Sequence, residues 1–284
     1  MKSQWLVRLG QWMGIILCWV FAGTFSVEAA VPAEKYPTAA HFPAFLEKIR
    51  AKAMTYVADL PDFTCIQITH RRERRMWQAS EWVPLQTLKA EVSYLEGKEQ
   101  YRLLRPAGSD SPAEMEKQLG TVSRGEFGTI LEQIFAPGSR TVFKLEGKDE
   151  RRKRETVLLS FLIRKENSQY RLSYREGSLL NQSITTAWGG KIWVDLGSHA
   201  VVCIASEALN LPLEFPFSSA KTVVAYDLIP VGDTQSWLPV RAEFSTTTAN
   251  LPEMSARMRS KERKNVIEFR EYRKYSVEVK ILNP

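Results

Sequence analysis

The chain has 284 residues, 44% of them hydrophobic and 25% charged, with a formal net charge of +7 at pH 7. This length is ample for a sizeable hydrophobic core. The charge excess is too small for a dedicated binder of polyanions, although it allows contact with anionic surfaces.

The N-terminus has the layout of a secretory signal. A basic start precedes an uncharged run over residues 9–27, and small residues follow at Ala29 and Ala30. This order predicts a signal peptide over residues 1–29 and an exported, single-domain mature chain over residues 30–284. An uncleaved membrane anchor is the alternative, because the 19 uncharged residues are close to the roughly 20 that span a bilayer.

Two amphipathic helices are predicted in the mature chain. The first is an N-terminal helix that Pro61 stops, because its apolar residues recur mostly at intervals of three and four. Those residues are Phe45, Leu46, Ile49, Ala53, Tyr56, Val57 and Leu60. The second helix is shorter, starts from a capping box of Ser123 and Glu126, and ends at residues 136–138. Its apolar face consists of Phe127, Ile130, Leu131, Ile134 and Phe135.

Most of the remaining chain alternates apolar and polar residues, which is typical of antiparallel strands with one wetter face. The first runs start near Phe63 and Leu88, a turn follows at residues 96–98, and residues 105–120 form an excursion without a pattern. Further strands are predicted over residues 142–145, 157–163, 170–174, 184–187, 192–195, 201–205, 223–228, 240–244 and 266–281.

A sheet this wide must curl, close or split into two layers. We predict a mainly β fold with helices: a strongly curved, open antiparallel sheet (a half-barrel) of about 10–11 strands. The N-terminal helix and the inserted helix are expected to cover its concave face.

The best-defined hairpin lies at residues 187–207. A short turn over residues 196–199 joins its two strands, and Gly189 and Gly190 let the backbone bend before the first strand. The hairpin residues predicted on the concave face are Ile192, Val194, Val202 and Ile204.

The mature chain keeps two cysteines, Cys65 and Cys203, and an exported compartment can be oxidising enough to join them. A disulfide would close a span of about 138 residues and add about 5 kcal/mol by the chain-entropy model. The alternative is two buried free thiols that pack as small hydrophobic groups. Spacing alone does not decide between them.

No motif in the sequence indicates catalysis. His41, His70 and His199 are isolated from one another, so neither a metal site nor a cofactor is predicted. The chain lacks a nucleophile elbow, a phosphate-binding loop and a dinucleotide fingerprint. Asp195 and Asp227 lie at strand ends, where we expect them to cap turns rather than act as acid and base.

Three basic runs lie beside strands, at residues 70–75, 151–154 and 257–264. We interpret them as solvated hairpin ends, with peripheral contact to an anionic membrane as the alternative. Nucleic acid is not expected as a partner, because binding would need these charges interleaved with exposed aromatic residues on one face. Export also separates the protein from a genomic partner.

The order of these segments resembles that of a known superfamily. It runs from YVADLPDFTCIQ through FGTILEQIFAPGSRTVFKLEG, GGKIWVDLGSHAVVCIA and TVVAYDLIPVG to the WLP of residues 237–239. Over roughly residues 42–282 it resembles the lipoprotein-carrier-like half-barrel superfamily of periplasmic carriers, outer-membrane receptors and an envelope-stress regulator. The resemblance implies a hydrophobic cavity suited to acyl chains. Where relatives commonly have a basic, an apolar and an acidic residue, this chain has Cys203-Ile204-Ala205, so it lacks one polar handle.

Together these features predict an exported, periplasmic, non-enzymatic and monomeric binding protein. Its expected ligand is a lipid, a lipoprotein acyl chain or another apolar molecule, in the trafficking of lipids or outer-membrane lipoproteins. The alternative is an interaction or stress-sensing module of the envelope with a closed, packed groove. The predicted cavity residues are Leu88, Val92, Tyr94, Phe127, Leu131, Val157, Leu159, Phe161, Ile192, Val194, Ile204 and Phe269.

Overall fold

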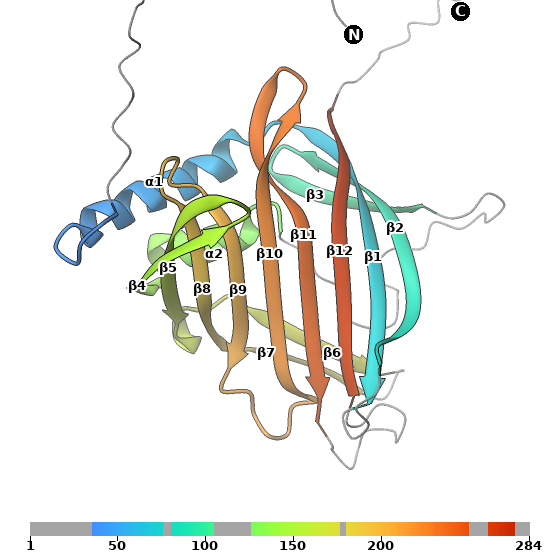
Figure 1. Cartoon of the computed structure of the whole chain (residues 1–284). Coiled ribbons are helices and arrows are strands. Elements are labelled where there is room, and N and C mark those ends of the chain that lie inside the picture. Colours follow the sequence, from blue (N-terminus) through green and yellow to red (C-terminus); the bar gives the residue numbers. More distant parts are fainter. Residues whose placement is uncertain (1–35, 76–80, 105–125, 177–179, 250–260, 276–284) are drawn as a thin grey trace, which may run out of the picture. The chain divides into compact units, whose positions relative to one another are not determined.

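The computed structural model of the protein describes residues 36–75, 81–104, 126–176, 180–249 and 261–275 (Figure 1). The chain divides into two units after residue 33, and every described residue belongs to the second unit. The predicted signal peptide and the predicted excursion at residues 105–120 lie outside the described residues. No described helix is long and apolar enough to cross a membrane.

Ten strands make up the main sheet. Their bounds are β1 Phe63–Arg75, β2 Val83–Leu95, β3 Lys98–Leu104, β4 Val142–Arg151, β5 Arg154–Ile163, β8 Ala187–Asp195, β9 Val201–Leu209, β10 Phe217–Val231, β11 Thr234–Thr248 and β12 Lys261–Lys274. All neighbours are antiparallel, in the order β3-β2-β1-β12-β11-β10-β9-β8-β5-β4 (Figure 1). The edge strands β3 and β4 do not pair with each other, so the sheet is open. The predicted fold class is confirmed.

The sheet has an inner face, which packs against the helices, and an outer face. Successive side chains of a strand point to opposite faces, and on β1 the buried residues Phe63, Cys65, Gln67 and Thr69 alternate with more exposed ones. The same alternation on the other strands gathers large apolar residues on the inner face. They form one continuous buried core with residues of both helices.

Helix α1 (Phe42–Asp59) packs a single apolar stripe into this core. Its buried residues Phe45, Ile49 and Ala53 recur every fourth position, which places them on one side of the helix. Proline stands in the first turn, where a missing backbone N–H costs nothing, and the helix ends just before Leu60. The predicted N-terminal helix is confirmed.

Helix α2 (Thr129–Phe135) is shorter than the capping box predicted. Its N-cap is Gly128, which makes no side-chain cap hydrogen bond, and Ser123 lies outside the described residues. Glu126 is buried ahead of the helix instead of closing its first turn. The predicted apolar face is present: Leu131, Ile134 and Phe135 of the helix are buried, Ile130 is partly buried, and Phe127 is buried just before the helix.

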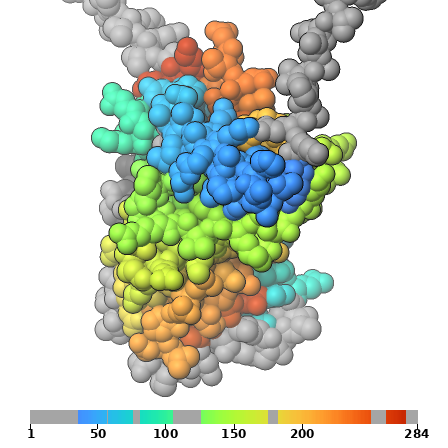
Figure 2. Space-filling view, turned by 90° about the vertical axis from the view of Figure 1, so that its left-hand side faces the viewer, coloured from blue at the N-terminus to red at the C-terminus, as the bar shows by residue number. Residues whose placement is uncertain are grey.

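Strands β6 (Arg171–Glu176) and β7 (Leu180–Thr185) form a hairpin of their own, outside the main sheet in which the sequence placed them. Tyr174 packs its ring edge-on against Phe217 of β10 at 5.4 Å between centroids, and Phe244 of β11 joins the same buried cluster. The hairpin therefore covers part of the inner face. In Figure 2, α1 in blue lies above the green segment that contains α2, and the yellow-green segment that contains β6 lies below it.

Gly189 and Gly190 allow the closest strand contacts in the hairpin of residues 187–207. A Cβ on Gly190 would lie 2.0 Å from the carbonyl oxygen of Ala205 on β9, and one on Gly189 would lie 2.6 Å from that of Phe161 on β5. Neither position has room for a side chain. The two glycines permit the close approach of β5, β8 and β9, beyond the bend that the sequence suggested.

Candidate ligand-binding face

The twelve residues predicted to line a cavity are all buried, on the inner face or beside α2. The strands carry Leu88, Val92 and Tyr94 on β2, Val157, Leu159 and Phe161 on β5, Ile192 and Val194 on β8, Ile204 on β9 and Phe269 on β12, while Phe127 and Leu131 come from the segment of α2. Eleven of the twelve belong to the continuous core, and Leu88 is buried outside it. In this structure those eleven side chains pack into one core.

The inner-face residues of the continuous core form what we call the apolar region. A short segment that includes α2 packs on it. We call residues 127–135 the plug. The Phe127 ring lies with its centroid 5.4 Å from that of Phe63 on β1 and 5.1 Å from that of Phe269 on β12. The four plug side chains that are buried against the sheet are Phe127, Leu131, Ile134 and Phe135.

Hydrogen bonds tie the plug at both of its ends. The Tyr226 hydroxyl of β10 donates to the Glu126 carbonyl oxygen at 3.1 Å, just before the plug. The hydroxyls of Ser139 and Thr141 donate to the Ile134 carbonyl oxygen at 3.2 and 2.6 Å. Between these two points the plug is held by apolar packing.

Burial in the apolar region suppresses the ionisation of the thiol and hydroxyl groups that lie there. Burial raises the pKa of the Cys65 thiol to about 12, and it raises the pKa of the Tyr226 and Tyr272 hydroxyls well above their ordinary values. These groups are therefore neutral at physiological pH. They offer hydrogen bonds and packing, such as the bond from Tyr272 to the Pro239 carbonyl oxygen, and not acid or base chemistry.

The possible disulfide between Cys65 and Cys203 is not formed, because both thiols are free and buried. Cys65 lies in the core, whereas Cys203 belongs to a separate cluster. Three strands lie between β1 and β9, and neighbouring strands are about 4.8 Å apart. That separation far exceeds the roughly 7 Å between Cα atoms that a disulfide can bridge.

The outer face carries this separate cluster, which consists of Trp193, Val202 and Cys203. The prediction that Val202 lies on the inner face is wrong. The pairing of β8 with β9 shifts register between Trp193 and Val194, and such a bulge changes which side chains share a face. The guanidinium of Arg151 stacks on the Trp193 ring at 4.0 Å, so the second basic run partly covers this cluster.

Along β1 and β12 the inner face becomes polar. Arg71 of β1 pairs in register with Asn265 of β12, and Glu73 pairs with Arg263, whose other neighbour is Thr246 of β11. We call this region the polar end. It consists of Gln67, Thr69, Arg71, Glu73, Thr246, Lys261, Arg263 and Asn265.

Two of the basic runs contribute residues to the polar end, so the interpretation of these runs as solvated hairpin ends is wrong. Lys261 is only 7% exposed, and its ammonium lies 2.8 Å from the Glu73 carboxylate. The Arg263 guanidinium lies 3.6 Å from the same carboxylate. Burial lowers the pKa of Arg71, and the nearby charge of Arg263 lowers it further. The signal that was missed is the period of two, which continues through β1 from Gln67 into the basic run.

The three histidines each have a local contact. His41 and His70 lie within hydrogen-bonding distance of threonine hydroxyls, and the His199 ring packs edge-on against Phe45 at 5.2 Å. In the described ranges, no three His, Cys, Asp or Glu side chains are grouped so that they could hold a metal ion.

The two aspartates predicted at strand ends differ in position and role. Asp195 accepts hydrogen bonds from the Ser198 backbone N–H at 2.8 Å and hydroxyl at 2.7 Å, which is the predicted turn cap. Asp227 instead lies inside β10, where it pairs with the Arg152 guanidinium at 2.9 Å and accepts a hydrogen bond from the Leu228 backbone N–H at 2.9 Å. The prediction that it caps a turn at a strand end is wrong, and its ion pair reaches the turn between β4 and β5.

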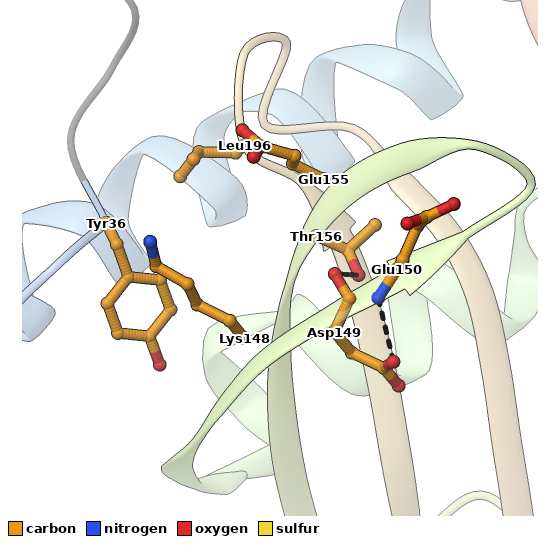
Figure 3. A pocket seen from close by; sticks show the side chains of 7 residues that line it. All are labelled: Tyr36, Lys148, Asp149, Glu150, Glu155, Thr156 and Leu196. Atoms are coloured by element: carbon orange, nitrogen blue, oxygen red, sulfur yellow. Dashed lines mark hydrogen bonds between the residues drawn. The ribbon is translucent and has the colours of Figure 1, made fainter.

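A small pocket lies beside β4 and β5, between Tyr36 and the turn after β8 (Figure 3). The Lys148 ammonium lies 5.2 Å from the centre of the Tyr36 ring, and Asp149 accepts a hydrogen bond from the Glu150 backbone N–H. The volume of this pocket, about 200 Å³, is below the roughly 300–1,000 Å³ that is typical of ligand pockets. We therefore place the candidate site on the inner face.

No protein-family model matches the chain, and no curated protein matches it. Among solved structures, a DUF1329 family protein from Desulfovibrio piger aligns at 10% identity over 84% of this chain and 94% of its own, with a TM-score of 0.41. A LolA superfamily protein from Nitrosomonas europaea aligns at 10% identity over 83% and 94%, with a TM-score of 0.31. An outer membrane lipoprotein-sorting protein domain from Vibrio parahaemolyticus aligns at 10% identity over 80% and 91%, with a TM-score of 0.37. Proteins of the superfamily that the sequence resembles are thus among the solved structures that align with most of this chain.

Proposed function

We propose that the protein is an exported, non-enzymatic binding protein that holds the acyl chain of a lipid or lipoprotein on the inner face of its sheet. The observation that carries this proposal is the plug, a short segment that places four large apolar side chains on that face. The acyl chain takes the position of these side chains when it binds. The role that follows is trafficking of lipids or lipoproteins in the envelope.

The free energy gained by burying the plug side chains is similar in size to the free energy gained by burying an acyl chain. Burial of a large apolar side chain contributes about 1.5–3 kcal/mol, so four contribute roughly 6–12 kcal/mol. A buried methylene contributes about 0.8 kcal/mol, so roughly 8–15 methylenes replace the plug. An ordinary fatty acyl chain has about that length. The exchange is therefore close to balanced, as a carrier that both loads and releases its cargo requires.

The plug can leave the sheet without breaking strand pairing. Helix α2 has seven residues, fewer than the roughly 12–15 that an isolated helix needs for even marginal stability in water. Its helical form depends on packing against the sheet and α1. Once an acyl chain replaces that packing, the segment loses the main interaction that keeps it folded.

Lipid mass spectrometry on denatured, purified protein gives the first test. A stoichiometric acyl species released from the protein supports the proposal. No bound lipid, together with no uptake of a fluorescent fatty acid, contradicts it. The inner face would then be a packed core, and the function would be that of an interaction module.

Two matched variants sharpen this test. Leu131→Ala shortens a plug side chain by about three carbons, and we expect at least about ten-fold tighter apparent binding of the fluorescent fatty acid because the plug competes less well. Val202→Ala removes apolar volume from the outer face and should leave binding unchanged. If both variants lose stability and neither gains affinity, the plug is ordinary core.

A further inference from the structure

The polar end continues directly from the apolar region on the same strands. On β1, Arg71 lies six positions after Cys65, a distance of about 20 Å at about 3.3 Å per residue. On β12 the inner-face residues change from Phe269 and Ile267 to Asn265 and Arg263. A chain lying along these strands touches apolar side chains at one end and charged ones at the other.

The polar end has an excess of positive charge. Among its described residues, Lys261 and Arg263 share the Glu73 carboxylate, and Arg71 is a third cation close to Arg263. Lys261 and Arg263 both lie within 3.6 Å of Glu73, whereas Arg71 lies beside Gln86, whose side-chain oxygen is 3.5 Å from its guanidinium. Buried charges of one sign destabilise a fold unless they are compensated.

In the part of the chain that the structure describes, two buried side-chain oxygens of the polar end have no hydrogen-bond partner. They are Oε1 of Gln67, which is 1% exposed, and Oγ1 of Thr246, which is 2% exposed. The Gln67 amide nitrogen does have a partner, the Thr69 hydroxyl at 3.2 Å. Leaving such a group unpaired costs stability, so each of these two oxygens points to a polar ligand.

We infer that the polar end binds the charged headgroup of an anionic amphiphile, a carboxylate or phosphate held by Arg71 and Arg263, while the acyl chain lies on the apolar region. The inference rests on the proposed function and names its ligand class. Guanidinium groups suit this role because their N–H donors match the oxygens of carboxylate and phosphate. The Thr246 hydroxyl can donate to the same headgroup, and Gln67 can accept a hydrogen bond from a hydroxyl on it.

Displacement of a neutral fluorescent acyl probe from the mature protein tests the inference. The competitors are palmitate, hexadecyl phosphate and hexadecanol, which share one chain length and differ in headgroup. We expect the two anionic compounds to bind about ten- to a hundred-fold tighter than the alcohol, the range of a charge-assisted hydrogen bond. Their order separates a carboxylate site from a phosphate site.

The variant Arg71→Gln should remove most of this preference and leave binding of hexadecanol unchanged. Arg72→Gln is the matched control, because Arg72 is exposed and points to the other face of the same strand. Arg71→Lys keeps the charge and should keep part of the preference. If Arg71→Gln does not fold, Arg263→Gln together with the salt dependence of palmitate binding replaces it.

The outcomes separate the two proposals. Equal binding of all three compounds, unchanged by Arg71→Gln, overturns the headgroup site and leaves acyl binding standing. No binding of any compound overturns both. A preference for the anionic compounds that survives both Arg71→Gln and Arg263→Gln contradicts the assignment to these residues.

Discussion

The apolar region and the polar end of the inner face bury their side chains in different ways, although β1 and β12 run through both. In the apolar region the Phe127 ring packs against the rings of Phe63 and Phe269. In the polar end Lys261 and Arg263 are held against Glu73.

Apolar packing stabilises the fold, whereas buried charge contributes little and often costs stability. The two regions therefore need separate explanations. The apolar region is accounted for by stability, even where it also receives a ligand. The polar end keeps groups that stability alone does not explain, and the proposed headgroup site accounts for them.

The largest expected effect lies in the apolar region. Phe127→Ala removes a fully buried ring and should lower the free energy of unfolding by about 3–5 kcal/mol, measured by chemical denaturation. Phe143→Ala is the control, because that ring is only partly buried where it stacks on Phe135 of the plug. Equal losses of unfolding free energy in the two variants would mean that Phe127 is packed no more tightly than Phe143.

A smaller effect is expected in the sheet that both regions share. Gly190→Ala forces a Cβ against the backbone of β9 and should lower the free energy of unfolding by about 1–3 kcal/mol or more. Gly138→Ala is the control, since a Cβ there meets no atom within 4 Å. A tolerated Gly190→Ala would show that β8 and β9 are less closely held than the structure has them.

The last expected effect is a pH dependence from the apolar region, which is absent near neutral pH and appears only in alkali. Burial raises the pKa of Cys65 from 9.0 to about 12, so the thiol ionises first in the unfolded chain. The stability it contributes is complete below about pH 9 and is lost as pH rises towards 12. Unfolding curves over this window should fall less steeply for Cys65→Ala than for the original protein. Parallel curves would contradict the burial of this thiol.

The fold was predictable because its signals are local. The periods of two and of three to four residues are visible in the chain, and they mark the strands and the stripe of Phe45, Ile49 and Ala53 on α1. Strand partners depend on contacts between distant residues. The sequence therefore did not show that β6 and β7 form a separate hairpin, or that three strands lie between the two cysteines.

The candidate site was predictable in its apolar region alone. Large apolar residues at regular spacing, such as Leu159 and Ile192, are reliably buried, and all twelve predicted cavity residues are. Arg71 and Lys261 were assigned to solvent because charged residues are seldom buried. Alternation along β1 places Arg71 on the face of Cys65, and that signal was outweighed by composition. The register shift beside Val202 has no visible signal in the sequence.

Thiol labelling tests most directly whether the plug leaves the sheet and an acyl chain replaces it. In a mature Cys203→Ser background the remaining thiol is Cys65, which is 1% exposed in the apolar region. We predict that Leu131→Ala makes Cys65 react with a maleimide about ten-fold faster, because the weakened plug opens more often, and that saturating palmitate slows the reaction again. Equal rates in the Leu131→Ala and Val202→Ala variants, with no effect of palmitate, would contradict the exchange of plug for ligand.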